Sequence, residues 1–410
     1  MTAPPARQPR DAISTLWDMH MRVRQLSATD DILSVITDDV LVSTARTLKR
    51  TSRNVQVALT ASAFLAEIAR YPGVVSRMIV KNYVSVLSDI LWKHADHAGI
   101  IGHVLTVLVC INHSVPSEIC RSDVAKHVVR LLRQPGLLLP WQSTCENLAR
   151  IISVLDWAAC AQAMLPDLAT LAQQFLDRCV HAYPTNHVIA EHATAILGGI
   201  LAARVPEKGR EELLQYILFQ HYGHPRICIR TVALLAKLAP GDVFFALQNA
   251  VRALSHLSKQ AVFCKNILGY INALVYDIHR HPACLVHLPA IVHACVSVMR
   301  TVQQHLPDAS IALMCFGILD ALMLVHNVVP FLVTFDIVTM LLDAAEFHIS
   351  VQLVQHSVCN MLALVTQDPT SIPAPVVSRM HVHLKKMGAF YVDSPAFILH
   401  TSRLLARFNK

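Results

Sequence analysis

Residues 55–93 read VQVALTASAFLAEIARYPGVVSRMIVKNYVSVLSDILWK, and this stretch decides the fold class. Apolar residues recur at spacings of three and four over 55–70 and again over 83–93, as they do in helices that bury one face. Pro72 and Gly73 interrupt the pattern, because proline cannot continue a helix and glycine readily ends one. The stretch therefore predicts a long helix, a break with a short helix, and a second long helix.

This helical pattern returns along the chain at intervals of about 42 residues. Equivalent apolar positions are separated by gaps of 43, 44, 44, 38, 37, 48 and 43 residues. A period in this range is the sequence signature of a helical repeat array. A helical bundle with accidental spacing is the alternative. The equivalent positions are Leu65, Leu108, Ile152, Ile196, Leu234, Ile271, Leu319 and Leu362.

The repeats resemble those of the armadillo family, with HEAT repeats as a near relative. Residues 55–69 carry V-Q-x-x-L-x-A-x-A-F-L-A-E-I-A, a Pro-Gly break follows, and residues 79–91 carry I-V-x-N-x-V-x-x-L-x-x-I-L. Asn82 stands where the family most often has glycine, and asparagine tolerates the left-handed backbone conformation. The resemblance covers about residues 30–408. It implies an all-α fold, a right-handed α-solenoid of about eight armadillo/HEAT-like repeats of about 42 residues.

The predicted array occupies residues 54–394. Because the ends of a solenoid need polar outer faces, we expect residues 1–53 to form an N-terminal segment with capping helices. Residues 395–410 are expected to form a C-terminal capping helix and a basic tail. Proline-rich residues 369–375 are the linker candidate inside the array.

The composition favours a helical chain with much buried surface. Hydrophobic residues make up 54% and charged residues 15%, and there are 12 glycines among 410 residues. These values exclude a disordered chain and a glycine-rich β protein. The net charge is +7, but residues 54–372 are neutral and residues 373–410 carry a net +5. The C-terminal end therefore predicts a basic patch for an acidic partner, with a merely solvated end as the alternative. The patch comprises Arg379, Lys385, Lys386, Arg403 and Arg407.

The cysteines indicate a reducing compartment. There are 11 of them, without a Cys-x-x-Cys pair, and most lie in apolar runs where free cysteine packs as a small hydrophobe. The first residues contain no apolar core of a secretory signal, and Asp11 and Asp18 disfavour a mitochondrial presequence. The long uncharged stretches contain prolines, histidines and amides, so no membrane span is predicted. We expect a cytoplasmic protein, with a ciliary or cytoskeletal assembly as one setting.

No catalytic motif is present in the sequence. Nucleotide-binding glycine loops, His-Glu-x-x-His, Gly-x-Ser-x-Gly and the kinase signatures are all missing. His279, His281, Cys284 and His287 are metal-ligand types, but their spacing matches no zinc motif. We therefore expect no enzyme, no metal and no cofactor. A metalloprotein built on these four residues is the minor alternative.

In the armadillo family the third helix of each repeat lines a concave face that binds partners. Importin-like members carry a Trp-x-x-x-Asn ladder on these helices. Here the four tryptophans are followed four residues later by Met21, Asp96, Cys145 and Ala161. The ladder is absent, which argues against a nuclear-import receptor.

The resemblance places two sets of polar residues on the predicted third helices. One set is largely basic and is expected to clamp an acidic segment through charge-assisted hydrogen bonds. The other carries amides and a histidine that are expected to bind a peptide backbone. For the first set, the alternative is that several of the residues point outward or into gaps between helices. The first set is Arg150, His192, Arg226, Arg230, Lys237, Lys265 and Asn266, and the second is Gln352, Gln355, His356 and Asn360.

These features predict a non-enzymatic scaffold or adaptor that binds one or more proteins through the concave face. The low charge is typical of a subunit of a larger assembly, for which a ciliary, cytoskeletal or trafficking complex is expected. The alternative is an RNA- or ribonucleoprotein-associated factor that uses the basic C-terminal end. Such a factor would bind with a steep dependence on salt.

Overall fold

In the computed structural model, helices are the only regular secondary structure among the described residues. Those residues form 23 helices and contain no strand, so the all-α prediction is confirmed. The described residues are 9–25, 29–50, 53–115, 124–155, 157, 165–203, 209–238, 242–276, 278, 286–325, 328–367 and 372–408.

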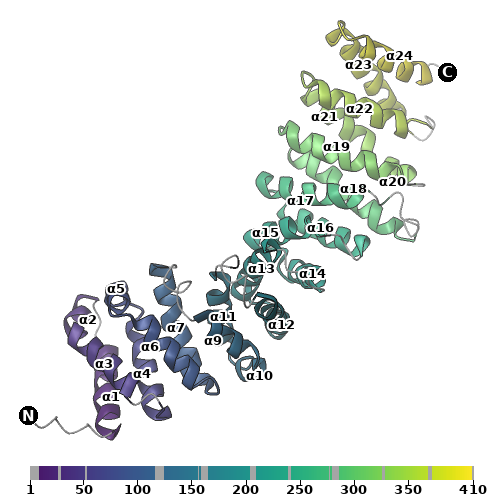
Figure 1. Ribbon diagram of the computed structural model, residues 1–410. Coiled ribbons are helices and arrows are strands. Elements are labelled where there is room, and N and C mark those ends of the chain that lie inside the picture. The colour runs from purple at the N-terminus through teal and green to yellow at the C-terminus, as the bar shows by residue number, and fades with distance from the viewer. Residues whose placement is uncertain are drawn as a thin grey trace, which may run out of the picture. The chain divides into compact units, whose positions relative to one another are not determined.

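The chain divides into two compact units, residues 1–210 and 211–410 (Figure 1). The sequence contains no shift in composition near residue 210, which is why this boundary was not predicted. The predicted limits at residues 53/54 and 394/395 stay predictions. Residues 368–371, which make up part of the predicted linker, lie outside the described residues.

In the N-terminal unit, helices that are neighbours in the predicted repeat pattern pack against one another. One row consists of α1, α4, α7, α11 and α13, each packed on the next. A second row consists of α3, α6, α9 and α12, again in contact one after another. The helices are α1 (Pro9–Gln25), α2 (Thr29–Val35), α3 (Asp38–Arg50), α4 (Val55–Ile68), α5 (Pro72–Val80), α6 (Tyr83–Lys93), α7 (Ala98–Ser114), α9 (Val124–Leu132), α10 (Pro135–Leu138), α11 (Gln142–Ser153), α12 (Leu165–Ala182) and α13 (His187–Ala202).

The C-terminal unit is built in the same way. Its first row is α15, α17, α19, α22 and α24, and its second row is α16, α18, α21 and α23. Apart from α1, the helices of both first rows lie where the sequence predicts third helices. The helices are α14 (Arg210–His221), α15 (Pro225–Leu235), α16 (Val243–Leu257), α17 (Ala261–Val275), α18 (Leu288–Gln304), α19 (Ala309–Met323), α20 (Val328–Thr334), α21 (Ile337–Phe347), α22 (Gln352–Val365), α23 (Ala374–Phe390) and α24 (Pro395–Phe408).

Local sequence explains where several helices begin. Asn54 and Asp308 accept hydrogen bonds from backbone amides in the first turns of α4 and α19, which satisfies groups that a helix leaves unpaired. Asn82 has a φ of 56°, so the predicted left-handed conformation is confirmed. Asp336 has a φ of 60° in front of α21, the position that corresponds to Asn82 in front of α6. A small polar side chain thus replaces glycine at both turns.

The predicted equivalent apolar positions lie in the core. All eight are buried, with Leu234 the most exposed at 7%. Close packing also involves Gly199 in α13. A Cβ atom at Gly199 would collide with the indole of Trp157, which is itself buried. The absence of a side chain at Gly199 therefore lets Trp157 lie directly on α13.

Polar side chains link turns that are separated by about one repeat length. Each donor lies just after a second-row helix and bonds a carbonyl in an earlier turn. Because a carbonyl only accepts, each ring nitrogen or hydroxyl must donate. The pairs are Tyr183 with Leu139, His305 with Ser258, His348 with Leu306 at 2.6 Å, and Tyr391 with Ile349 at 2.8 Å.

Among the described residues, no single helix combines the length and apolarity needed to cross a bilayer. The pair α20 and α21 meets the criteria only jointly, and the two helices are bent by 73° relative to each other.

Candidate functional site

Three of the predicted basic residues are exposed on or just after α15. Arg226 and Arg230 are one helical turn apart and therefore share a face of the helix. Lys237 follows the end of the same helix and is also exposed. These three residues form a cationic group at α15, which is the first helix of the first row in the C-terminal unit.

Arg150 and His192 belong to the N-terminal unit and are half-buried. The Nδ1 atom of His192 on α13 lies 3.0 Å from the Ser153 hydroxyl on α11, so this ring links two packed helices. The predicted basic stretch is therefore divided between two compact units, and His192 of the N-terminal unit contacts a neighbouring helix.

Lys265 and Asn266 on α17 have partners within the fold. The Lys265 ammonium forms a 2.9 Å ion pair with Asp308, the residue that caps α19. The hydrogen bond from Lys265 is the main reason that the pKa of the Asp308 carboxyl is lowered. Asn266 is exposed and donates to the Val262 carbonyl of its own helix at 2.9 Å. Lys265 thus joins neighbouring helices as well as facing the surface.

The prediction that Gln355 binds a peptide is wrong, because its side chain is fully buried. Its amide nitrogen donates to the carbonyls of Ala345 and His348 at 2.6 and 2.9 Å, at the end of α21. Its amide oxygen lies 3.3 Å from Nε2 of His383. A helix end leaves carbonyls without partners, and Gln355 satisfies two of them.

The other predicted residues of α22 are exposed. Gln352, His356 and Asn360 follow one another at four-residue intervals and so lie on one face. This face offers two amides and an imidazole ring, groups that can both donate and accept hydrogen bonds.

The predicted basic patch at the C-terminal end is smaller than the sequence suggested. Arg379 on α23 bonds Asp343 at 2.6 Å and Glu346 at 2.7 and 3.0 Å. These hydrogen bonds, first the one to Glu346, raise the pKa of the Arg379 guanidinium. Arg379 stays charged, and the two carboxylates balance its charge within the fold. Lys385 and Lys386 are exposed on the same helix. Arg379 is corrected from a patch residue to an ion-pair residue.

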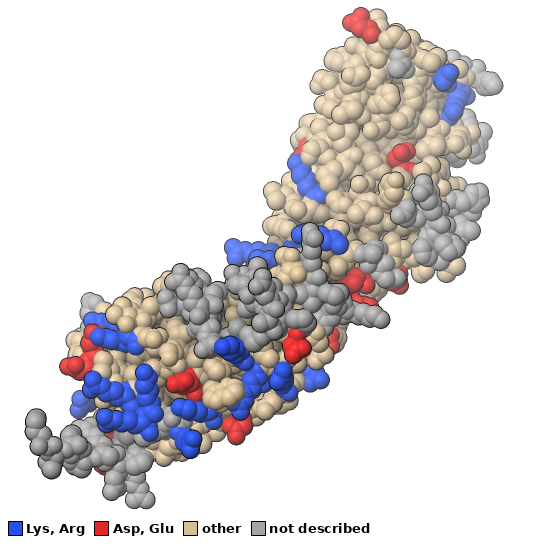
Figure 2. Space-filling model, in the orientation of Figure 1, with Lys and Arg blue, Asp and Glu red and all other residues tan. Residues whose placement is uncertain are grey.

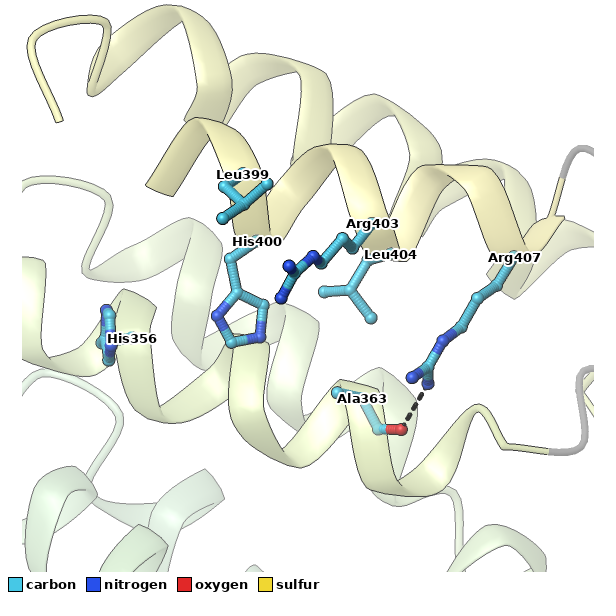
Figure 3. A pocket seen from close by; sticks show the side chains of 7 residues that line it. All are labelled: His356, Ala363, Leu399, His400, Arg403, Leu404 and Arg407. Atoms are coloured by element: carbon cyan, nitrogen blue, oxygen red, sulfur yellow. Dashed lines mark hydrogen bonds between the residues drawn. The ribbon is translucent and has the colours of Figure 1, made fainter. Parts of the chain in front are cut away.

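Arg403 and Arg407 of the predicted patch instead meet His356 at a cleft between α22 and α24 (Figure 3). Arg407 donates to the Ala363 carbonyl in the last turn of α22 at 2.6 Å. His400, which the sequence analysis did not single out, completes the site, and its ring centroid lies 6.0 Å from that of His356. The sequence could have indicated His400, because it lies one helical turn before Arg403, which was already predicted. The cleft is lined by His356, Ala363, Leu399, His400, Arg403, Leu404 and Arg407.

The structure also shows a basic surface that the sequence analysis missed. Figure 2 shows Lys and Arg side chains gathered on one face of the N-terminal unit. In this unit α3, α6 and α9 pack in succession, and the exposed indole of Trp92 lies under the Arg130 guanidinium at 4.4 Å. Residues 46–133 contain 12 basic and 5 acidic residues, a net charge of +7, but this excess is cancelled when charge is counted over residues 54–372 as a whole. The exposed basic residues include Arg46, Lys49 and Arg50 on α3, Lys93 on α6 and Lys126 on α9.

The structure brings one cysteine and one histidine together, but not in a reactive arrangement. The sulfur of Cys264 lies 3.6 Å from Nε2 of His305. That nitrogen donates to the Ser258 carbonyl, so it cannot accept the thiol proton. Burial raises the pKa of the Cys264 thiol to about 11, and the side chain is fully buried. The pair is therefore a packing contact.

No group of three or more potential metal ligands occurs among the described residues. Three of the four predicted ligand types, His279, His281 and Cys284, lie outside those residues. The fourth, His287, stacks on Phe244 with ring centroids 4.1 Å apart. In comparisons with known proteins, no family model and no curated protein matches this sequence.

Proposed function

We propose that this chain is a non-enzymatic scaffold or adaptor, built as an armadillo-like α-solenoid of about eight repeats of about 42 residues. The observation that carries the proposal is the row of packed helices α15, α17, α19, α22 and α24, which presents exposed polar and basic side chains at both ends. The protein binds a partner along this row.

The hydrogen bonds between turns support the repeat architecture. His348 bonds a carbonyl 42 residues earlier, and so does Tyr391. Their acceptors, Leu306 and Ile349, are 43 residues apart. A side-chain contact that recurs with the period of the apolar pattern is expected when each repeat stacks on the one before it.

The exposed groups of the row suit a protein segment better than a small metabolite. Arg226 and Arg230 supply guanidinium groups that bind carboxylates in a bidentate manner. Gln352 and Asn360 supply side-chain amides that pair with a peptide backbone. Because these residues are spread over helices of one unit, an extended acidic segment is the partner that they fit.

The structure does not strengthen the RNA alternative at the basic C-terminal end. Arg379 is one of the five basic residues on which this alternative depends, and it forms ion pairs with Asp343 and Glu346. The remaining cations lie on different helices, with Lys385 and Lys386 on α23 and the others on α24. The scaffold proposal is the one that the exposed row favours.

The proposal is tested by affinity capture of the tagged protein from its native extract, with nuclease added and mass spectrometry as the readout. The variant Arg226→Glu reverses a charge on the row, whereas Arg300→Glu reverses an exposed charge on the second-row helix α18. We expect Arg226→Glu, and more strongly its combination with Arg230→Glu, to lose stoichiometric partners that Arg300→Glu retains. Equal capture by all three proteins, with unchanged circular dichroism, would remove the row as the binding face.

A further inference from the structure

The cleft between α22 and α24 concentrates cationic and ionisable groups without a carboxylate. Arg403, Arg407 and His400 come from α24 and His356 comes from α22. None of the seven lining residues is acidic. Like charges that converge in this way repel one another unless an anion lies between them.

This repulsion contributes to the lowered pKa of His400. Its pKa is lowered first by burial and then by the charges of His356, Arg403 and Arg407. The helix α23 also packs on α24, but among the described residues none of its charged groups contributes to this shift. An anion in the cleft would offset these charges and raise the pKa of His400.

The side chains are arranged so that their donors remain available. Arg403 and Arg407 are one turn apart on α24, which places their Cβ atoms about 5–6 Å from each other. The bond from Arg407 to the Ala363 carbonyl uses one of its five N–H groups and holds the side chain in place. Figure 3 shows the His400 ring beside the Arg403 guanidinium, with both directed toward α22.

The surroundings of the cleft indicate which anion it fits. The cleft encloses about 330 Å³ and includes the aliphatic side chains of Leu399 and Leu404, which suits one or two short side chains better than a nucleotide. His356 is also the middle member of the exposed face formed with Gln352 and Asn360 on α22. Amides that pair with a peptide backbone thus adjoin cations that pair with its side chains.

We propose that the cleft formed by His356, His400, Arg403 and Arg407 binds the carboxylates of an acidic segment of a partner protein. This inference rests on the proposed scaffold function and identifies where an acidic residue of the partner is held. The two guanidinium groups, which lie one turn apart on α24, each bind one carboxylate of the segment. His400 adds to the attraction when it is protonated, so binding strengthens as the pH falls through its titration.

The test uses the full chain and a fluorescein-labelled alternating Glu-Ala decapeptide, with a Gln-Ala decapeptide as the neutral control. Fluorescence anisotropy should show binding of the acidic peptide only, tighter at pH 6 than at pH 8. The variant Arg403→Gln removes a lining guanidinium, and Lys386→Gln removes an exposed cation on α23 outside the cleft. We expect Arg403→Gln to weaken binding about tenfold and Lys386→Gln less than twofold.

A second readout follows His400 directly by NMR. The acidic peptide should raise the pKa of His400 in the wild-type protein. The neutral peptide should leave that pKa unchanged. Equal losses for Arg403→Gln and Lys386→Gln, or no binding of the acidic peptide, would overturn the inference. Inorganic phosphate that displaces the peptide at a lower concentration than free glutamate would also overturn it, in favour of a phosphate site.

The two proposals can fail separately. If Arg226→Glu abolishes capture of protein partners while Arg403→Gln changes neither capture nor peptide binding, the scaffold function stands and the cleft assignment is wrong. If the wild-type protein captures no stoichiometric partner, the scaffold function itself is wrong.

Discussion

The Nε2 atom of His348 donates a 2.6 Å hydrogen bond to the carbonyl oxygen of Leu306, 42 residues earlier in the chain. Ile349, the residue after His348, accepts the corresponding bond from Tyr391. One turn therefore supplies a donor to the preceding turn and an acceptor to the following one. Such bonds connect neighbouring helix pairs, so their loss should affect stability without altering any single helix.

The first prediction concerns the bond between Tyr391 and Ile349. Replacing Tyr391 with phenylalanine removes the hydroxyl but keeps the ring that stacks on Phe397 at 4.6 Å. We expect a loss of about 1 kcal/mol in the free energy of unfolding, the usual contribution of one such bond. Urea denaturation followed by circular dichroism measures it.

The matched control for this change is Tyr276→Phe. Tyr276 is 70% exposed and ends α17 in the same unit. Its hydroxyl should contribute nothing measurable to stability. Equal midpoints for the two variants would contradict a structural role for the bond between the turns.

The second prediction concerns Gly199. The substitution Gly199→Ala places a methyl group against the Trp157 indole, so it should destabilise the N-terminal unit by about 1–3 kcal/mol through overpacking. The matched control is Gly317→Ala in the middle of α19, where a Cβ atom meets nothing within 4 Å. That change should stabilise the protein by about 0.5–1 kcal/mol, because alanine favours a helix over glycine. Shifts of the same sign in thermal unfolding would refute the packing account.

The third prediction concerns the ion pairs of Arg379. The hydrogen bond from Arg379 is the largest cause that lowers the pKa of Glu346. Such a group stabilises the fold at neutral pH, and this contribution is lost as the pH falls toward its folded-state pKa. Because these side chains are more than a third exposed, we expect Arg379→Gln to reduce the free energy of unfolding by less than about 1 kcal/mol at pH 7. The difference from wild type should shrink on acidification, and a growing difference would contradict the assignment.

The fourth prediction concerns His383. Burial is the main reason that its pKa is lowered, and its side chain is 2% exposed. The unfolded chain binds a proton near pH 6.5 and the folded chain only at lower pH. The protein should therefore lose stability as the pH falls below about 6.5, and His383→Gln should reduce this loss. Urea midpoints at pH 7.5 and 5.5 test it; an unchanged pH dependence in the variant would show that other groups dominate.

The sequence alone predicted the two long helices of its clearest repeat closely. The helices expected over residues 55–70 and 83–93 correspond to α4 and α6. The left-handed Asn82 was also predicted correctly. These features depend on apolar spacing and backbone preference over a few residues, so the local sequence contains the information.

The site residues show where local information ends. Gln355 and His356 are adjacent in sequence, yet one is fully buried and the other is exposed. Successive side chains on a helix differ in direction by about 100°, so an error of one residue in helix phase reverses a prediction. The groups that meet at the cleft, His356 with Arg403 and Arg407, come from separate helices.

Sequence periodicity thus determined that this chain is helical and where most of its helices lie, because a helix forms and buries its apolar face through neighbours three and four residues away. The tertiary structure alone decided that the charge of Arg379 is balanced by Asp343 and Glu346 while Arg403 remains exposed beside His356. A charge is free or paired according to which helices pack together, and that packing joins residues more than thirty positions apart.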